Sequence, residues 1–417
     1  MSSNRSPRSG LAICIASGEE GGGIARVLKT LADALPRRGW HVEILCLGRG
    51  DGRLANEVGR GAAVGLGLVP PGNFAGGPVN KIVRFAKVRR FATRHADEIA
   101  SRAKQMISEW RAAGGDGPVV LETVSPHLLP VVGKAAEKLG VTVVWDMPNT
   151  VGNLGGLGIN QWLYKSMCRR HAVLPLANSG HTAASFGDSE PAAHVVQPMT
   201  DERRFDPAKL PEDVRTRARD KLGLPADARV LGMLARLTHD KGPHRLIDAA
   251  AAYNRNSDRP FHVLLVGDGP AEYLDDLRRR AKADGVDGSV HVGEGTRHVE
   301  ELLPACDIGV NARMTAEPFG LSVVEAMMMN IPVLAHAFGG PAETVVDGVT
   351  GWHVLQADDD EALTRGLTAA LQRVVNDEPR WPQMGRDARA RALKCFSTRA
   401  LTDRWIELAS RHAAKHA

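Results

Sequence analysis

The chain has 417 residues, of which 43% are hydrophobic and 24% are charged. This length is too great for one hydrophobic core and predicts two large domains. The composition is that of an ordinary globular protein, and no segment approaches the run of about 18 apolar residues that a membrane span needs. The formal net charge of +5 is modest for this length, so we expect no nucleic-acid partner.

The amino terminus and the cysteines favour a cytoplasmic protein. The apolar run LAICIA at 11–16 is shorter than the core of a secretion signal and is typical of a first strand. The five cysteines are scattered, odd in number and without CxxC or Cys/His ligand spacing. We therefore expect reduced, mostly buried thiols and no bound metal.

A basic segment stands out near the amino terminus. Residues 58–96 contain no acidic residue but hold seven cations, which are Arg60, Lys81, Arg84, Lys87, Arg89, Arg90 and Arg94. Basic and apolar positions interleave imperfectly on a helix over 81–94, which favours a solvated basic helix over a membrane-lying one. The alternative is docking to an acidic acceptor or to an anionic membrane, with the protein peripheral at its inner face.

In chain order, short apolar runs rich in β-branched residues alternate with helical patterns. In the first half the strands are expected at 11–17, 41–48, 118–124 and 141–147, and the helices at 22–38, 81–94 and 127–139. This alternation is typical of βαβ units, with a parallel sheet covered on both faces.

The alternation restarts after a polar stretch near 197–205. Strands are expected at 229–237, 261–269, 289–295, 308–313 and 331–337, with helices near 243–256 and 271–283. The sequence therefore predicts an α/β protein of two Rossmann-like, doubly wound domains, at 1–200 and 201–385. The last stretch, 386–417, should be helical, broken around 395–397, and able to pack back towards the first domain.

In open parallel sheets, ligands bind outside the carboxyl ends of the strands. With two such sheets, the natural site is the cleft between them. Loops that follow strands should therefore carry the important residues.

The first such loop is glycine-rich. Gly21, Gly22 and Gly23 follow the first strand and open a helix, which suits close approach of a phosphate or a sugar to backbone N–H groups. The run does not fit GxGxxG, and a plain glycine-rich turn is the competing interpretation.

The second and third loops are LARLTHDKG and LLVGDGP. Arg236 and Lys241 could neutralise a diphosphate, unless they are ordinary surface cations. Gly267 and Gly269 mark a tight strand-to-helix turn, and Glu272 stands where a dinucleotide fingerprint would need a third glycine.

The segment AEPFGLSVVEAMMMN carries two carboxylates. Glu317 precedes a proline and should be extended, whereas Phe319, Gly320 and Leu321 should present backbone amides at a helix start. Glu325 should lie about 7 Å further along that helix. A diphosphate on these amides would leave one glutamate beside each end of the ligand, and carboxylates accept hydrogen bonds from sugar hydroxyls.

Together these segments resemble the retaining glycosyltransferases of family four, which have the GT-B fold. The resemblance is densest from Val230 to Val354 and is most specific in EPFGLSVVE followed by IPVLAHAFGGPAETVVDGVTGWHV. The segments GMLARLTHDKG, LLVGDGP and LPLANSGHTAASF and the amino-terminal glycine loop are also similar.

The resemblance implies a role for each matching position. Glu317 would bind the donor sugar's hydroxyls, Glu325 the ribose, and Arg236 with Lys241 the diphosphate. The amides of residues 319–321 would touch phosphate and sugar, and the loop of Gly21 to Gly23 would close over the donor. In this family, cations and a helix dipole do the work of a metal on the leaving diphosphate, so no metal and no further cofactor are implied.

Two details qualify this picture. Pro148 stands where the family often has a histidine near the reacting sugar, so His127, Asp146 or Asn149 could contact the acceptor instead, although each of the three is more often structural. The acidic run 358–360, directly before EALTRGL, is read as a helix cap and not as a metal site.

The expected function is transfer of a hexosyl unit from a nucleotide diphosphate sugar to an acceptor hydroxyl with retention of configuration. The β-phosphate would leave and take the acceptor's proton, and the acceptor would be a glycan, a glycolipid or a small molecule, as in polysaccharide biosynthesis. The alternatives are a nucleotide-sugar epimerase or phosphorylase of the same fold, or an inactive nucleotide-sugar-binding subunit.

Overall fold

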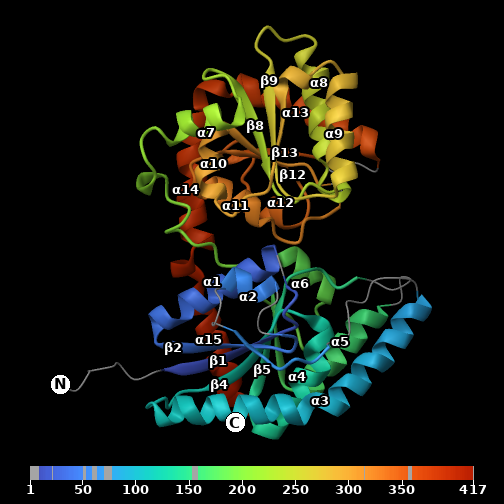
Figure 1. Ribbon diagram of the computed structural model, residues 1–417, viewed down its shortest axis with the longest axis vertical. Coiled ribbons are helices and arrows are strands. Elements are labelled where there is room, and N and C mark those ends of the chain that lie inside the picture. Colours follow the sequence, from blue (N-terminus) through green and yellow to red (C-terminus); the bar gives the residue numbers. More distant parts are fainter. Residues whose placement is uncertain are drawn as a thin grey trace, which may run out of the picture. The chain divides into compact units, whose positions relative to one another are not determined.

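The computed structural model describes residues 9–20, 22–49, 53–58, 63–69, 78–152, 158–313, 315–355 and 359–416. The chain forms two compact units. The first consists of Met1–Met199 with Thr398–Ala417, and the second consists of Thr200–Ser397. Each is built on one parallel sheet with helices on both faces (Figure 1).

The sheet of the first unit has the strand order β3-β2-β1-β4-β5-β6-β7. Every residue of β1 is buried, as expected for the centre of a parallel sheet covered on both faces. The strands are β1 (Gly10–Ala16), β2 (Trp40–Cys46), β3 (Ala63–Gly65), β4 (Val119–Thr123), β5 (Thr142–Met147), β6 (Val173–Ala177) and β7 (His194–Val195).

Helices cover both faces of this sheet. One apolar cluster packs α3 to α6 against it, and a second packs α1, α2 and α15 against the other face. The helices are α1 (Gly23–Ala34), α2 (Arg53–Val58), α3 (Pro78–Ala112), α4 (Leu129–Leu139), α5 (Ile159–Arg170), α6 (Gly180–Phe186) and α15 (Thr398–His416), with 3-10 turns η1 (Leu35–Arg38) and η2 (Pro126–Leu128).

The sheet of the second unit has the order β10-β9-β8-β11-β12-β13. The chain order reverses direction at β8, between β9 and β11, which is the kind of switch point where ligands bind in α/β sheets. The strands are β8 (Arg229–Leu234), β9 (Phe261–Val266), β10 (Val290–Gly293), β11 (Ile308–Asn311), β12 (Val333–His336) and β13 (Gly351–Val354).

Helices cover both faces of the second sheet too. Helices α8, α9 and α13 share one apolar cluster, and α7, α10, α11 and α14 share the other. The helices are α7 (Val214–Leu222), α8 (Pro243–Asn254), α9 (Ala271–Ala283), α10 (Val299–Leu302), α11 (Leu321–Met328), α12 (Gly340–Thr344), α13 (Asp360–Asn376) and α14 (Trp381–Phe396), with 3-10 turns η3 (Pro207–Lys209), η4 (His239–Lys241), η5 (Asp287–Ser289), η6 (Leu303–Ala305) and η7 (Glu378–Arg380).

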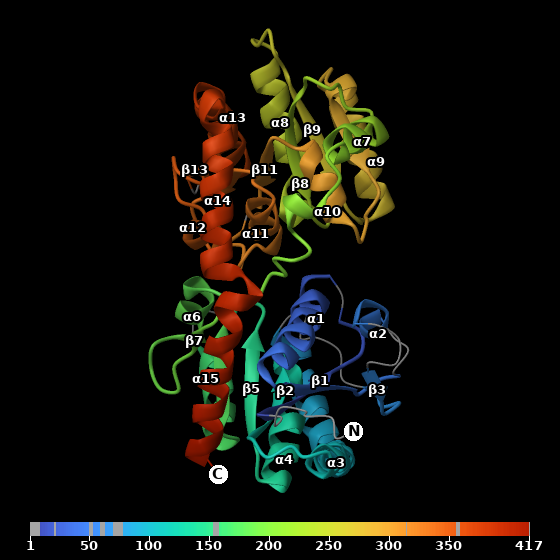
Figure 2. The same ribbon diagram turned by 90° about the vertical axis from the view of Figure 1, so that its left-hand side faces the viewer.

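The carboxy-terminal helices divide between the units. The expected boundary before residue 386 lies inside α14, which packs on the second unit, and the chain returns to the first unit only at Thr398. There α15 lies along β5 (Figure 2). The ring of Trp405 packs edge-to-face against that of Trp40, with 5.6 Å between the ring centroids. Its Nε1 donates to Asp146 at 3.3 Å.

The expected strands and helices are confirmed for most of the chain, and the prediction of an α/β protein with two doubly wound domains is confirmed. The break near 395–397 is also confirmed, because α14 ends at Phe396 and α15 begins at Thr398. Asp359 caps α13 by accepting from Ala362 N at 2.7 Å, whereas Asp358 lies outside the described residues. The basic helix is longer than expected and runs over Pro78–Ala112.

Several elements escaped prediction because their sequence signal is weak. Strand β6 contains Pro175 in a sheet interior, where proline is uncommon, and β3 and β7 are very short.

The five cysteines are free, and four of them are buried, as expected. Among the described helices, none has both the length and the apolar character to cross a membrane.

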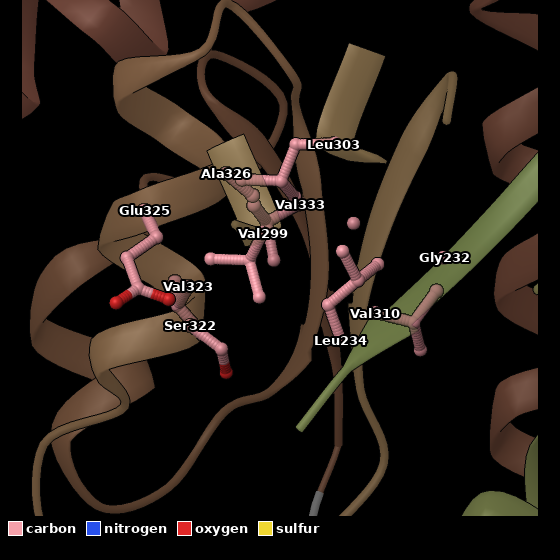
Figure 3. Close-up of a pocket in the computed structure, with 11 residues that line it drawn as sticks. Gly232, Leu234, Val299, Leu303, Val310, Ser322, Val323, Glu325, Ala326 and Val333 are labelled. Carbon is pink, nitrogen blue, oxygen red and sulfur yellow. The ribbon is translucent and has the colours of Figure 1, made fainter. Parts of the chain in front are cut away.

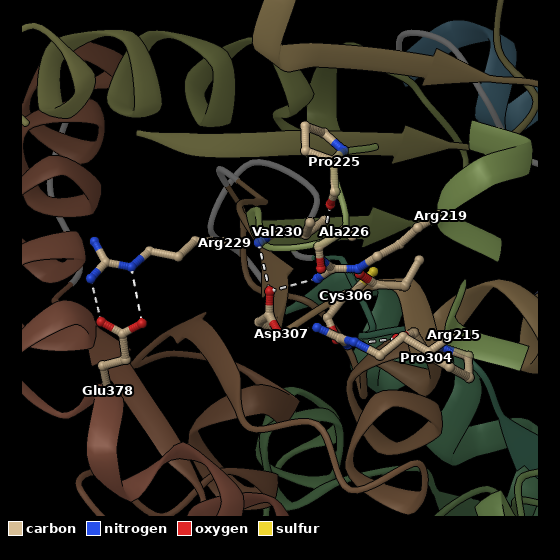
Figure 4. Close-up of polar contacts among 11 residues, drawn as sticks. Arg215, Arg219, Pro225, Ala226, Arg229, Val230, Pro304, Cys306, Asp307 and Glu378 are labelled. Carbon is tan, nitrogen blue, oxygen red and sulfur yellow. Dashed lines mark hydrogen bonds and ion pairs between the residues drawn. The ribbon is translucent and has the colours of Figure 1, made fainter. Parts of the chain in front are cut away.

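A charged cluster ties the first helix of the second unit to its sheet (Figure 4). Asp307 accepts from Arg215 at 2.6 Å, from Arg219 at 3.1 Å and from the backbone N of Val230 at 2.8 Å. The side chain of Arg219 is 3% exposed, so Asp307 supplies the counter-charge for a buried guanidinium that otherwise donates to backbone carbonyls. In the same figure, Arg229 forms a fork with the carboxylate of Glu378.

Replacing Asp307 should therefore destabilise the second unit. Asp307→Ala leaves the Arg219 guanidinium buried without its counter-charge, which should cost about 3 kcal/mol. Asp213→Ala is the control, because Asp213 pairs with Arg217 on the same helix but both side chains are more than half exposed. That loss should stay below about 1 kcal/mol. Hydrogen exchange of β8 and β11 peptides measures both, and equal losses would contradict this account.

Candidate active site

The loops after β8 and β9 run against each other at one edge of the second sheet. The backbone N of Ala235 donates to Val266 O at 3.0 Å, and that of Leu237 donates to Asp268 O at 2.9 Å. A Cβ on Gly267 would lie 1.7 Å from Ala235 O. A Cβ on Gly269 would lie 2.2 Å from Leu237 O, so both glycines are required by loop packing, whatever they contact in a ligand.

The loop after β8 is also packed on the loop after β11. Gly242 has a φ of 75°, and a Cβ there would lie 2.2 Å from Ala312 O. The fully buried Arg245 donates from Nη1 to the same carbonyl at 3.1 Å and pairs with Asp360 at the start of α13. This packing brings the loop after β8, which carries Lys241, next to the loop after β11, which carries Glu317.

Lys241 and Glu317 meet directly, as a site built from both loops requires. Lys241 Nζ lies 2.5 Å from Glu317 Oε2, and the Glu317 side chain is 12% exposed. Arg236, on the same loop as Lys241, is exposed.

The backbone of Glu317 is extended and held by the glycine pair after β12. Glu317 forms an isolated parallel bridge with Gly339, and Gly340 N donates to Glu317 O at 2.7 Å. A Cβ on Gly339 would lie 2.4 Å from Glu317 O. The GG of the sequence motif therefore fixes the glutamate's position.

Helix α11 begins where the sequence indicated. Gly320 is its N-cap in the left-handed region, with a φ of 93°, and the helix runs over Leu321–Met328. Phe319 is buried, with its ring 5.7 Å from that of Phe396 between centroids. The first N–H groups of a helix have no intrahelical partner and lie at the positive end of its dipole, which suits an anion.

Glu325 lies one turn into α11 and borders a small pocket (Figure 3). The figure shows the oxygen atoms of Glu325 and Ser322 on the α11 side and the apolar side chains of Leu234 and Val310 opposite. Glu325 is 5% exposed. The remaining lining residues are Gly232, Val299, Leu303, Gly309, Val323, Ala326 and Val333.

The sequence-predicted residues of the first unit are more dispersed. Gly22 is the N-cap of α1 with a φ of 61°, and a Cβ added there would meet no atom within 4 Å. Gly23 begins the helix, whereas Gly21 lies outside the described residues. His127 lies in η2 and is 7% exposed, and burial lowers its pKa, so the ring is neutral at pH 7. Asn149 is exposed.

Asp146 is engaged in a contact of its own. It sits at the end of β5, near Glu122 and beneath Trp405 of α15, and burial raises its pKa to about 6 despite the Trp405 hydrogen bond. Burial and the charge of Asp146 raise the pKa of Glu122 well above its usual range. These two carboxyls share the interface between the sheet and α15.

Two features of the sites were missed by sequence reasoning. Arg313, after β11, has Nη1 3.1 Å from Glu317 Oε1, and its spacing of four residues from Glu317 was the available signal. Glu20 accepts from the backbone N of Ser17 at 2.7 Å and of Gly18 at 2.8 Å, and from Ser125 Oγ at 3.2 Å. Glu20 therefore shapes the loop after β1. Among the described residues, no group of three or more His, Cys, Asp or Glu is placed to hold a metal ion.

Two family patterns match the chain, one in each unit. The family described as Glycosyl transferase 4-like domain matches residues 22–177, and the family described as Glycosyl transferases group 1 matches residues 214–391. The second match contains Arg236, Lys241, Glu317 and Glu325.

Curated relatives match over part of their length. A D-inositol 3-phosphate glycosyltransferase of Corynebacterium glutamicum is 32% identical over 200 residues, which is 46% of each chain. A GDP-mannose-dependent α-(1-6)-phosphatidylinositol monomannoside mannosyltransferase of Mycolicibacterium smegmatis is 33% identical over 238 residues, or 55% of this chain and 58% of that protein. The aligned segments thus span about half the length of these relatives.

Solved structures share the fold over nearly the whole chain. Anabaena HepE in complex with UDP and glucose gives a TM-score of 0.71 at 21% identity, covering 95% of this chain and 98% of the other. A glycosyltransferase from Rickettsia africae gives 0.76 at 17% identity, covering 97% and 98%. With the fold and both family patterns in agreement, the chain belongs to the group 1 glycosyltransferases of family four, which have the GT-B fold.

Proposed function

We propose that the protein transfers a hexosyl unit from a nucleotide diphosphate sugar to an acceptor hydroxyl, with retention of configuration and without a metal. The observation that carries the proposal is the arrangement around the start of α11. Glu317 precedes this helix and Glu325 lies within it, with Lys241 in contact with Glu317. Anion-binding amides thus lie between two carboxylates suited to hydroxyls.

The diphosphate is proposed to lie on the first amides of α11, next to Lys241 and Arg236. As the bond to the sugar breaks, negative charge grows on the β-phosphate, and fixed cations with a helix start stabilise that charge. The leaving phosphate would accept the acceptor's proton. Neither glutamate is asked to transfer a proton, and retention is inferred from the family alone.

The ribose of the nucleoside is proposed to lie beside Glu325. The oxygen-bearing side chains of Glu325 and Ser322 lie together on α11, as Figure 3 shows. A carboxylate there can accept hydrogen bonds from both ribose hydroxyls.

The relatives' names guide the acceptor class. They act, by name, on inositol 3-phosphate, on a phosphatidylinositol mannoside or in lipopolysaccharide core biosynthesis. We extend to this chain only their shared chemistry, which is a polyol or sugar hydroxyl, in several cases attached to a lipid. His127, Asp146 and Asn149 of the first unit remain candidates for the acceptor side.

A lipid-linked acceptor would fit the exposed cations of α3. Lys87, Arg90 and Arg94 are exposed and follow one stripe at helical spacing, whereas Val88 and Ala92 are buried on the other side of the helix. We propose that this stripe attracts an anionic membrane surface, which would make the protein peripheral. Each cation near such a surface contributes about 1 kcal/mol.

The central test combines donor binding with transfer. A nucleotide sugar at about 100 times its dissociation constant should stabilise the protein by about 2.7 kcal/mol, so a thermal-shift panel identifies the donor. Glu317→Ala should then lower transfer about 100-fold while leaving binding of the nucleoside diphosphate nearly intact. Arg236→Ala should weaken both, with an affinity loss of about tenfold or more.

Glu361→Gln is the control, because that carboxylate is 85% exposed and pairs with Arg365 on the helix surface. Full transfer by Glu317→Ala, or unchanged donor affinity in Arg236→Ala, would refute the assignment. Donor consumption without any acceptor would favour the epimerase, and donor binding without turnover would favour the inactive subunit.

Ribose recognition can be tested with altered ligands. If Glu325 accepts the ribose hydroxyls, the wild-type protein should bind the 2′,3′-dideoxy nucleoside diphosphate about tenfold more weakly than the ribose form. Glu325→Gln should weaken only the ribose form, so that the two ligands bind nearly equally. Calorimetric titration of both ligands measures this difference. An undiminished preference for ribose in Glu325→Gln would remove Glu325 from this role.

Membrane attraction predicts a salt-sensitive signal. The wild-type protein should co-sediment with vesicles containing 30% anionic lipid at low salt, and the bound fraction should fall as salt rises, because screening shortens the range of the attraction (about 8 Å at 0.15 M). The double variant Arg90→Glu and Arg94→Glu should lose the binding. Arg278→Glu, an exposed charge reversal on α9, is the control. Equal binding by the two variants would contradict a role for α3.

A further inference from the structure

Each of the two carboxylate oxygens of Glu317 contacts a cation. Lys241 Nζ lies 2.5 Å from Oε2, and Arg313 Nη1 lies 3.1 Å from Oε1. The two cations come from different loops, one after β8 and one after β11. Rotation of the carboxyl group would break both contacts, so this pair of cations sets the direction of its lone pairs.

Arg313 is itself held by further partners. Its Nη2 lies 3.6 Å from Asp240 Oδ2, and its Nε donates to Thr315 Oγ1 at 3.2 Å. Asp240 in turn accepts from Thr238 Oγ1 at 2.6 Å. Partial burial works to raise the pKa of Asp240, but the Thr238 hydroxyl and the nearby cations outweigh it and lower that pKa, so Asp240 is charged at neutral pH.

The backbone of Glu317 leaves only the side chain adjustable. Its carbonyl accepts from Gly340 N at 2.7 Å, and its bridge to Gly339 holds the extended conformation before Pro318. The Cα is therefore fixed by the fold. The direction of the carboxyl group is then set by its contacts with Lys241 and Arg313.

Arg313 and Lys241 differ in what they can still bind. A lysine ammonium is a point charge with three donors, so Lys241 can contact Glu317 and a phosphate oxygen together. Arg313 already directs its guanidinium at two carboxylates and a hydroxyl. Its charge is compensated by Asp240 and Glu317, which makes it a poor phosphate ligand and a good support for Glu317.

We propose that Arg313, backed by Asp240, is a positioning residue that aims the Glu317 carboxylate at the hydroxyls of the donor sugar. It should govern recognition of the sugar and leave recognition of the nucleoside diphosphate to other groups. This inference rests on the proposed function, because it assumes that Glu317 contacts the sugar.

The test separates the sugar from the nucleotide. Arg313→Ala should leave the Kd of the nucleoside diphosphate within about twofold of wild type but weaken the matching nucleotide sugar about tenfold, the value of one charge-assisted contact. The kcat should fall by at least as much, because the carboxylate is then aimed by Lys241 alone. Arg313→Lys keeps the charge without the fork and should recover part of both losses.

Two further variants keep the test decisive. Asp240→Asn acts one step further out, at a side chain that is 49% exposed, and should give a smaller loss of the same kind even if Arg313→Ala folds poorly. Arg365→Ala is the matched control, because Arg365 pairs with Glu361 on an exposed helix face and should change nothing.

The outcomes are distinguishable. An equal loss of affinity for nucleoside diphosphate and nucleotide sugar in Arg313→Ala would make Arg313 a phosphate ligand and overturn the proposal, as would wild-type kinetics in both Arg313→Ala and Asp240→Asn. If the wild-type protein binds neither ligand, the proposed function itself fails and this inference fails with it. A loss confined to the nucleotide sugar and partly recovered by Arg313→Lys supports the proposal.

Discussion

The candidate site depends on backbone lying directly against backbone. A Cβ on Gly267, Gly242 or Gly339 would fall 1.7 to 2.4 Å from the carbonyl oxygen of Ala235, Ala312 or Glu317, closer than any side chain allows. Each of these carbonyls belongs to a loop that follows a strand or precedes α11. The glycines thus let four loops, those after β8, β9, β11 and β12, pack together at the carboxyl ends of the strands, where Lys241 and Glu317 meet. The contact between these two charged side chains is therefore a consequence of backbone packing.

Packing of the loops also brings several charged side chains together, and the cations among them differ in how many carboxylates they contact. Lys241 and Arg313 each contact Glu317, and Arg313 also faces Asp240. Arg236 is exposed on the same loop as Lys241. A cation that is already paired serves to orient its partner, whereas an exposed one can meet an incoming anion at little cost in lost contacts. This inequality is the physical reason to assign Arg236 to the diphosphate and Arg313 to Glu317.

Much of this could be predicted from the sequence, because buried parallel strands are nearly continuous apolar runs and because the GG and EPFG segments need particular backbone conformations. Strand β9 and helix α11 therefore appeared near their true positions. Arg313 was not singled out, since its role depends on Asp240, which lies on another loop. The return of α15 to the first unit was only one option in the sequence, because an amphipathic helix does not specify which sheet it covers.

Contacts within the first unit limit which of the candidate side chains could bind an acceptor. Asp146 accepts from Trp405 of α15, and burial that raises its pKa to about 6 makes its charge costly at that position. Its carboxyl group is therefore already used in the attachment of the carboxy-terminal helix α15. Buried His127 is a neutral ring able to donate or accept one hydrogen bond, and Asn149 is exposed directly after Pro148. Among the described residues that follow β5, Asn149 thus offers an exposed amide, which suits orienting a hydroxyl better than deprotonating it.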